Sequence, residues 1–245
     1  MRLPDPPQGA PGTPSVRLET VETVADDWFT LRRFRLAATR RDGTVQHLTR
    51  LSFDRGDRAA VLLYSRASGT VVLTGQFRLP LLLHDVPGGE LLEVPGGLLD
   101  DADACEAVRR EAEEETGYRV RELRRAFTAY MAPQLSAERT HLFTGEYDPA
   151  LRTGPGGGVA EEGEDIRVRE LPLQQAIDAV SRQPAADAKT LLLLLHAHNQ
   201  GLCAPQGPAH HAAHDAAHDA AHHAAHHAAH DAAHDAAHDE KGRPT

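Results

Sequence analysis

Four glutamates stand close together in the stretch Arg-Glu-Ala-Glu-Glu-Glu-Thr-Gly, which begins at Arg110, and three of them have a spacing that could do chemistry. On a helix, Glu111, Glu114 and Glu115 occupy positions i, i+3 and i+4, so their side chains share one face within a single turn. These like charges repel one another and disfavour an isolated helix unless a cation neutralises them. Mg²⁺ and Mn²⁺ prefer carboxylate oxygen, and a cation held in this way binds phosphate. The spacing therefore predicts a divalent metal site that handles a phosphate-containing substrate.

The alternative interpretation of the same glutamates is a solvated acidic helix face, paired with Arg109 and Arg110. An arginine directly beside a metal-binding glutamate more often orients a ligand than merely solvates the helix. We therefore favour the metal site.

Composition limits the classes of function that this chain can have. With 245 residues and 40% apolar content, it is large enough for one catalytic domain with appendages. A formal net charge of -10 argues against nucleic acid as a partner, and the longest apolar run, Leu191–Leu195, is too short to span a membrane. Two cysteines are too few for a disulfide framework, and the first 15 residues lack the apolar core of a signal peptide. We expect a cytoplasmic protein.

Four regions are expected along the chain: a disordered N-terminus over 1–15, a β-rich segment over 16–57, a catalytic domain over 58–200 and a low-complexity tail over 201–245. The clearest element is a helix over 103–116, with Asp100, Asp101 and Asp103 as candidate N-terminal caps and Gly117 as its end. Strands are expected, from residue type and turn signals, over 28–36, 45–53, 59–64, 71–77, 91–94, 125–130, 140–147 and 166–171. Helical periodicity favours further helices over 173–181 and 186–198, and a break is expected at 95–97.

The predicted helix and its flanks resemble the signature of the Nudix hydrolase superfamily, whose members cleave a nucleoside diphosphate linked to another group. The usual signature has glycine, five residues, glutamate, seven residues and then Arg-Glu-x-x-Glu-Glu-x-Gly. Here Gly97 is followed after five residues by Asp103, and only six residues precede Arg110. The aspartate and the shortened loop are departures from the usual pattern.

The shortened signature resembles the branch that hydrolyses GDP-mannose and related substrates, and further matches support this branch. They are Trp28-Phe29-Thr30-Leu31, Asp54-Arg55-Gly56, Gln76-Phe77-Arg78, Tyr130-Met131-Ala132-Pro133 and Gly156-Gly157-Gly158-Val159. The resemblance covers about Val24 to His196. It implies an α/β fold, the Nudix α/β/α sandwich with a mixed β-sheet. It also implies an N-terminal β-rich dimerisation segment that is exchanged between the subunits of a homodimer.

The resemblance implies a metal site and a general base. Glu111 and Glu115 match magnesium ligands, Gly96 matches a ligand that acts through its backbone carbonyl, and Glu114 could bind a second ion or its water. Glu164 matches a loop glutamate that completes the metal site and is a candidate general base. Because the loop carries a two-residue insertion relative to the pattern, Glu161 or Glu162 could replace it.

Further residues match positions that contact substrate in this branch. Arg78 matches a phosphate-binding residue, a task that suits a guanidinium, and Trp28 matches an aromatic that stacks on the nucleobase. The other expected contacts are Arg50, Gly97, Leu98, Glu138 and Lys189. Arg78 could equally be an ordinary arginine at the end of a strand, and a single tryptophan is more often part of a core. The branch's Lys-Arg-Glu triplet is here Thr49-Arg50-Leu51, which puts the base or sugar preference in doubt.

The segment 208–239 repeats Ala-Ala-His-Asp or Ala-Ala-His-His. If helical, histidines four residues apart, such as His214 and His218, would share a face and bind zinc, nickel or copper. If disordered, the tail becomes cationic as the pH falls through the imidazole range. We expect an accessory tail that can bind transition metals and is dispensable for catalysis.

The expected reaction is Mg²⁺-dependent hydrolysis of the pyrophosphate bond of a nucleoside diphosphate sugar, with Mn²⁺ as a possible substitute. GDP-mannose would give GMP and mannose 1-phosphate, whereas ADP-ribose, the alternative substrate, would give AMP and ribose 5-phosphate. Two other classes compete with the enzyme: a catalytically silent Nudix module that binds a nucleotide, and a metal store that works through the tail. The complete set of glutamates in the signature argues against the silent module.

Overall fold

The computed structural model of the chain describes residues 15–99 and 102–204. The candidate caps Asp100 and Asp101 lie outside the described residues, as do residues 1–14 and the histidine-rich tail from Pro205 onward. Within the described part of the chain, no helix is long and apolar enough to cross a membrane.

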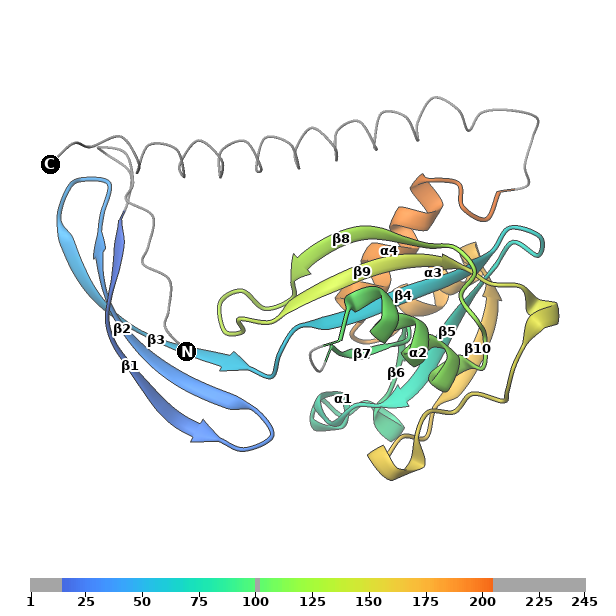
Figure 1. Ribbon diagram of the computed structural model, residues 1–245, viewed down its shortest axis with the longest axis horizontal. Coiled ribbons are helices and arrows are strands. Elements are labelled where there is room, and N and C mark those ends of the chain that lie inside the picture. Colours follow the sequence, from blue (N-terminus) through green and yellow to red (C-terminus); the bar gives the residue numbers. More distant parts are fainter. Residues whose placement is uncertain (1–14, 100–101, 205–245) are drawn as a thin grey trace, which may run out of the picture. The chain divides into compact units, whose positions relative to one another are not determined.

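An antiparallel three-stranded sheet comes first in the sequence and is drawn in blue in Figure 1. It consists of β1 (Val16–Asp26), β2 (Thr30–Thr39) and β3 (Val45–Asp54), paired in the order β1-β2-β3. The turn into β3 uses Gly43 with a φ of +85°, which suits glycine. Among the residues of these three strands, only Ala37 is buried. The sheet therefore contributes almost no core within one chain.

A mixed seven-stranded sheet forms the centre of the second region. Its strands follow the order β10-β5-β4-β9-β8, with β6 pairing to β5 and β7 to β4. The β4–β9 pair is parallel and the others are antiparallel. The bounds are β4 (Arg58–Ser65), β5 (Thr70–Phe77), β6 (Glu90–Glu93), β7 (Gly96–Leu98), β8 (Leu123–Tyr130), β9 (Arg139–Glu146) and β10 (Arg167–Pro172).

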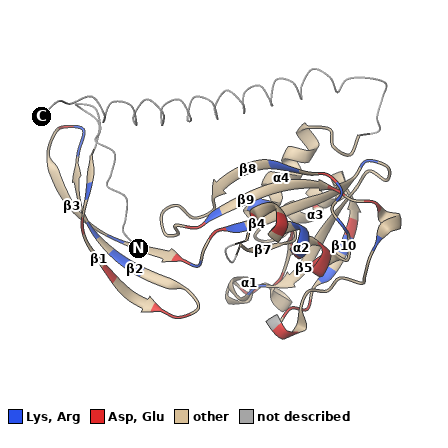
Figure 2. Ribbon diagram, in the orientation of Figure 1, with Lys and Arg blue, Asp and Glu red and all other residues tan. Residues whose placement is uncertain are grey.

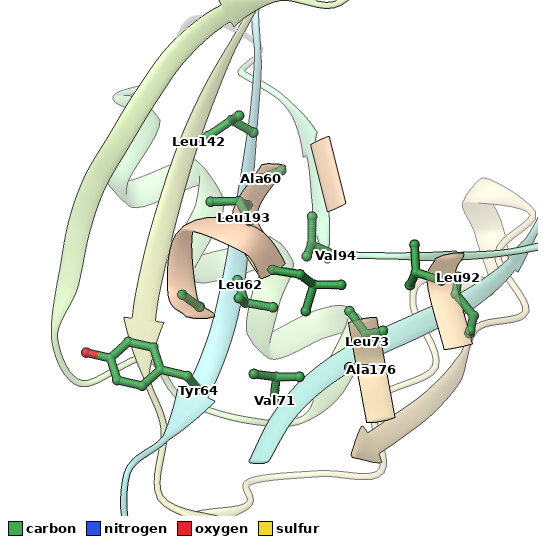
Figure 3. Packing of buried hydrophobic residues seen from close by; sticks show 13 residues of the cluster. Ala60, Leu62, Tyr64, Val71, Leu73, Leu92, Val94, Leu142, Ala176 and Leu193 are labelled. Carbon is green, nitrogen blue, oxygen red and sulfur yellow. The ribbon is translucent and has the colours of Figure 1, made fainter. Parts of the chain in front are cut away.

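Helices cover both faces of this sheet, which confirms the expected α/β/α sandwich. Along β4, Ala60, Leu62 and Tyr64 pack into a core with α3 (Leu173–Ser181) and α4 (Ala188–Asn199), as Figure 3 shows. The alternate residues Ala59, Val61 and Leu63 pack against α2 (Ala104–Thr116) on the other face. This alternation is the period of two expected of a strand buried on both sides. Shorter helical elements are α1 (Leu79–Leu83), η1 (Pro87–Gly89), η2 (Pro149–Leu151) and η3 (Ala160–Glu162).

The expected break at 95–97 is wrong in part, because β7 begins at Gly96 and pairs with β4. A Cβ placed on Gly96 would collide with the backbone carbonyl of Ala59 and with Ala60. Glycine is therefore needed here so that two strands can approach closely, a use that the sequence does not distinguish from a turn. Helix α1 was also not expected, since its five residues are too few to show a helical period.

Helix α2 begins and ends as its sequence predicts. The Asp103 carboxylate accepts hydrogen bonds from the backbone N–H groups of Cys105, at 2.8 Å, and Glu106, at 3.4 Å. Gly117 ends the helix with a φ of +74° and donates its N–H to the carbonyl of Glu113. These caps fix the register of Glu111, Glu114 and Glu115 on the helix.

The cap predicts a measurable loss of stability. Asp103→Ala should lower the free energy of unfolding by about 1 kcal/mol, because two helix N–H groups lose their acceptor. Urea denaturation followed by circular dichroism measures this change. Asp103→Asn is the matched control, since it removes the charge and keeps the acceptor. A loss in the asparagine variant as large as in the alanine variant would contradict the capping role.

Candidate active site

Glu115 is a buried carboxylate at the interface between α2 and the sheet. Its side chain points at β7, where Oε1 accepts a hydrogen bond of 3.0 Å from the Gly96 N–H, and the residue is only 4% exposed. No lysine or arginine among the described residues forms an ion pair with it. A buried carboxylate with one hydrogen bond and no countercharge is costly, so the site favours an added cation.

Glu111 lies one turn earlier on α2 and faces the next glycine of β7. A Cβ placed on Gly97 would lie 2.6 Å from Cδ of Glu111, so only glycine leaves room for this carboxylate. Arg110 reaches Glu111 at 3.2 Å and Glu114 at 3.8 Å. Glu114 is exposed, at the edge of the group. Figure 2 shows the acidic segments of α2 in red.

Burial and neighbouring negative charges both raise the pKa of Glu115. Burial raises the pKa of Glu115 to about 8, against the opposing hydrogen bond from Gly96. The negative charges of Glu164, Glu111 and Glu93 raise it further. The set consists of hard oxygen donors with an excess of negative charge, which suits Mg²⁺ or Mn²⁺. The expected site residues therefore fit a divalent cation.

The glycine-rich loop brings Glu164 toward this group. Gly156, Gly157 and Gly158 all have positive φ, and the N–H of Gly157 donates to the carbonyl of Glu115 at 2.9 Å. The Glu164 carboxylate accepts the N–H of Val159 at 2.9 Å. The loop is thus fastened to the last turn of α2, and Glu164 is close enough to affect the pKa of Glu115.

The metal ligands and the general base remain predictions. Glu161, an alternative to Glu164, is exposed, and the side chain of Glu162 is not among those described. Within the described ranges, no three His, Cys, Asp or Glu side chains form a ready-made metal cluster.

A polar pocket of about 240 Å³ gathers three of the expected substrate contacts, Arg78, Glu138 and Lys189. Its other lining residues are Arg58, Glu93, Met131, Ala132, Ser136, Thr140 and Asp187. Lys189 is in the first turn of α4, whereas Arg78 follows β5 and Glu138 precedes β9. The fold therefore brings together residues that are far apart in the sequence.

Glu93 forms ion pairs with both Arg78 and Lys189, a role that was not expected from the sequence. Its carboxylate binds Arg78 Nε through one oxygen and Lys189 Nζ through the other, each at 2.5 Å. Lys189 also reaches Asp187 at 3.0 Å. Burial opposes ionisation, but Lys189 and Arg78 together hold the pKa of Glu93 below its usual value. The available signal was an acidic residue within the apolar stretch Leu91–Val94.

Other expected contacts lie elsewhere. Leu98 and Gly97 are on β7, paired with Arg58 and Ala59 of β4. Trp28 lies between β1 and β2, Arg50 is on β3, and neither lines the pocket. Trp28 is 61% exposed with the Arg55 guanidinium 4.5 Å from its ring centroid, and Arg50 donates to the carbonyl of Thr49. Within one chain, these two residues are not brought to the pocket.

Family models match most of the described chain. The NUDIX domain model matches residues 54–194, and a model described as the GDP-mannose pyrophosphatase NudK N-terminal domain matches residues 15–53. The boundary between the two models falls where the three-stranded sheet gives way to the mixed sheet.

Similar proteins are found among curated sequences and solved structures. The GDP-mannose pyrophosphatase of Pectobacterium atrosepticum is 46% identical, over 73% of this chain and 91% of its own length. That of Cronobacter sakazakii is 42% identical, over 77% of this chain and 97% of its own length. A crystal structure of an ADP compounds hydrolase covers 79% of this chain and 99% of its own, with a TM-score of 0.57 and 20% identity. This last likeness concerns the fold alone.

The contact between Gly97 and Glu111 predicts the effect of adding one methyl group. Gly97→Ala should weaken Mn²⁺ binding by about tenfold, because the new Cβ displaces the Glu111 carboxylate from its place beside β7. Electron paramagnetic resonance titration of Mn²⁺ measures the affinity. Gly154→Ala is the matched control, since a Cβ there meets nothing within 4 Å. Unchanged Mn²⁺ affinity in the Gly97 variant would remove Glu111 from the metal site.

Proposed function

The chain belongs to the Nudix family, and on this premise we propose that it hydrolyses the pyrophosphate bond of GDP-mannose, releasing GMP and mannose 1-phosphate. The observation that carries the proposal is the buried Glu115 carboxylate, held against Gly96 beside Glu111 with no cation of the described chain paired to it. Such a site is suited to a divalent metal that binds the diphosphate. The adjoining pocket supplies arginine and lysine for the rest of the substrate.

The choice of substrate is supported by the relatives. The proteins named GDP-mannose pyrophosphatase match this chain over nearly their whole length, at identities of 46% and 42%. The N-terminal sheet separately matches a domain model described for a GDP-mannose pyrophosphatase. Both halves of the chain thus point to the same substrate class.

Under this proposal, Glu111, Glu115 and the Gly96 carbonyl hold Mg²⁺, for which Mn²⁺ can substitute, with Glu164 completing the site and Glu114 at its edge. When bound, the metal offsets charge on the phosphates and lowers the pKa of the attacking water. Glu164 accepts the proton of that water, a role that suits a carboxylate on a loop fastened to α2. Arg78 binds a phosphate oxygen, while Glu138 and Lys189 orient the substrate in the pocket.

The reaction is tested with a panel of nucleoside diphosphate sugars, including GDP-mannose and ADP-ribose, followed by ³¹P nuclear magnetic resonance. With Mg²⁺, GDP-mannose should give two phosphomonoesters, and chelation should stop the reaction because the buried carboxylates then have no cation. Tight binding of one nucleotide without turnover of any would identify a silent module instead.

Glu115→Gln extends the same test. It keeps the size of the side chain and removes a charged ligand, so turnover should fall by about a hundredfold or more. Glu113→Gln is the matched control, since Glu113 lies on the same helix but pairs with Arg119 away from β7. Turnover of the Glu115 variant within a few-fold of the parent would mean that the metal site is misplaced.

The three-stranded sheet supports the further proposal of a homodimer in which this segment is exchanged. Its strands bury almost nothing within one chain, and they expose large apolar side chains on both edge strands. These are Val16, Val21, Val24, Val45 and Leu51. Sheets usually bury at least one face, so a second copy would supply the missing contact. The exchange would also carry Trp28 and Arg50 toward the nucleoside half of the substrate in the partner's active site.

Sedimentation equilibrium tests the dimer. At micromolar concentration, the mass should be twice the 26.6 kDa of one chain, because apolar side chains on β1 and β3 are then removed from water. A single-chain mass across the concentration range would contradict the exchange of this segment. The cytoplasmic location and the metal-binding tail stay predictions.

A further inference from the structure

Arg58 opens β4 and occupies a junction of three strands. It pairs with Leu98 of β7 on one side and with Thr140 of β9 on the other. Because side chains alternate along a strand, Arg58 shares the face of Ala60 and Leu62, opposite to α2. Its side chain lines the polar pocket together with Arg78 and Lys189. The sequence gives no sign of this role, since Arg58 reads as an ordinary residue at the start of a strand.

Arg58 differs from the other cations of the pocket in making no side-chain hydrogen bond or ion pair with the described residues. Arg78 and Lys189 are both bound to Glu93, and Lys189 also to Asp187. No printed hydrogen bond or ion pair joins the half-buried Arg58 guanidinium to any residue in 15–99 or 102–204. A guanidinium carries five donors and stays charged, so partial burial without a partner is costly. This cost is recovered when a ligand supplies the acceptors.

The surroundings of Arg58 favour an anion. Burial lowers the pKa of Arg58. The negative charges of Glu138 and Glu93 oppose this, whereas the positive charges of Arg55 and Arg78 lower the pKa further. Cations that face one pocket repel each other in the same way as the glutamates of α2. An anionic group bound between Arg58 and Arg78 removes that repulsion and gains charge-assisted hydrogen bonds.

The pocket wall indicates which part of the substrate enters. None of the described residues that line it is aromatic, and most of them offer charged or hydroxyl groups. Such a wall provides hydrogen bonds for sugar hydroxyls and phosphate oxygens, but no surface on which a purine can stack. The sugar 1-phosphate half therefore suits this pocket better than the nucleoside half.

We propose that Arg58 is a substrate-binding residue that grips the phosphoryl group of the sugar 1-phosphate half, opposite to Arg78. The proposal rests on the function proposed above and names a specificity contact for it. Arg58 discriminates by charge and geometry, because a guanidinium presents two parallel N–H groups to a phosphate, whereas lysine offers a point charge. It acts on binding of the sugar phosphate rather than on activation of the attacking water.

Product inhibition separates the two halves of the substrate. In Arg58→Gln, inhibition by mannose 1-phosphate should weaken by about tenfold or more, as expected for the loss of a charged hydrogen bond. The KM for GDP-mannose should rise by a similar factor, whereas inhibition by GMP should stay within about twofold. Arg58→Lys should fall between the parent and the glutamine variant, because it keeps the charge and loses the fork.

Arg66→Gln is the matched control, since Arg66 follows the far end of β4 and does not line the pocket. It should leave inhibition by both products unchanged. Equal weakening of both products in the Arg58 variants, or no change in either, would overturn the proposal. Thermal melting shows whether each variant folds. If Arg58→Gln does not fold, Arg58→Lys is compared with the parent instead.

Isothermal titration calorimetry tests the role of Arg58 independently of whether the protein hydrolyses GDP-mannose. Titration of mannose 1-phosphate into the parent and into Arg58→Gln needs no turnover. A parent that binds mannose 1-phosphate through Arg58 but hydrolyses nothing would contradict the reaction alone. A parent that hydrolyses GDP-mannose, with equal mannose 1-phosphate affinity in both proteins, would contradict only the role of Arg58.

Discussion

The hydrogen bond between the Gly96 N–H and the Glu115 carboxylate is the contact on which the site depends. It positions the Glu115 carboxyl group inside the interface of α2 and the sheet, where burial and three neighbouring carboxylates act against its ionisation. An apolar side chain at this position would make the folded protein more stable than a buried carboxyl group does. The position of Glu115 is understandable when a divalent cation provides the missing charge.

The surrounding structure serves this contact. β7 approaches β4 closely because Gly96 has no side chain, and the absence of a side chain on Gly97 leaves room for Glu111. The caps at Asp103 and Gly117 set where α2 begins and ends, and hence which glutamates face β7. Glu93 connects the cation pocket to the carboxylates, since it binds Lys189 and its charge also affects Glu115. Metal site and pocket are thus two parts of one electrostatic system.

The sequence predicted helix α2 and its glutamates, because both depend on residues that are close together in the chain. The spacing of Glu111 and Glu115 and the capping residues of α2 depend on neighbours within a few positions, so the helix and its chemistry could be read from the sequence. Glu93 and Arg58 could not, because their roles arise from strands and a helix far apart in the chain, as in the ion pair between Glu93 and Lys189. The resemblance to a family predicted Arg78, Glu138 and Lys189 as substrate contacts. It did not predict Glu93, which binds two of them, or Arg58, which lines the same pocket. The predicted roles of Trp28 and Arg50 depend on a second subunit, which no local sequence pattern specifies.

The most direct test of the central claim is the position of a bound metal. A crystal soaked in Mn²⁺ and measured at the manganese absorption edge locates the ion by its anomalous scattering. A peak coordinated by the carboxylates of Glu111 and Glu115 and by the Gly96 carbonyl is expected. A Mn²⁺ ion bound elsewhere in the chain, with Glu115 still held only by the Gly96 N–H, would contradict it.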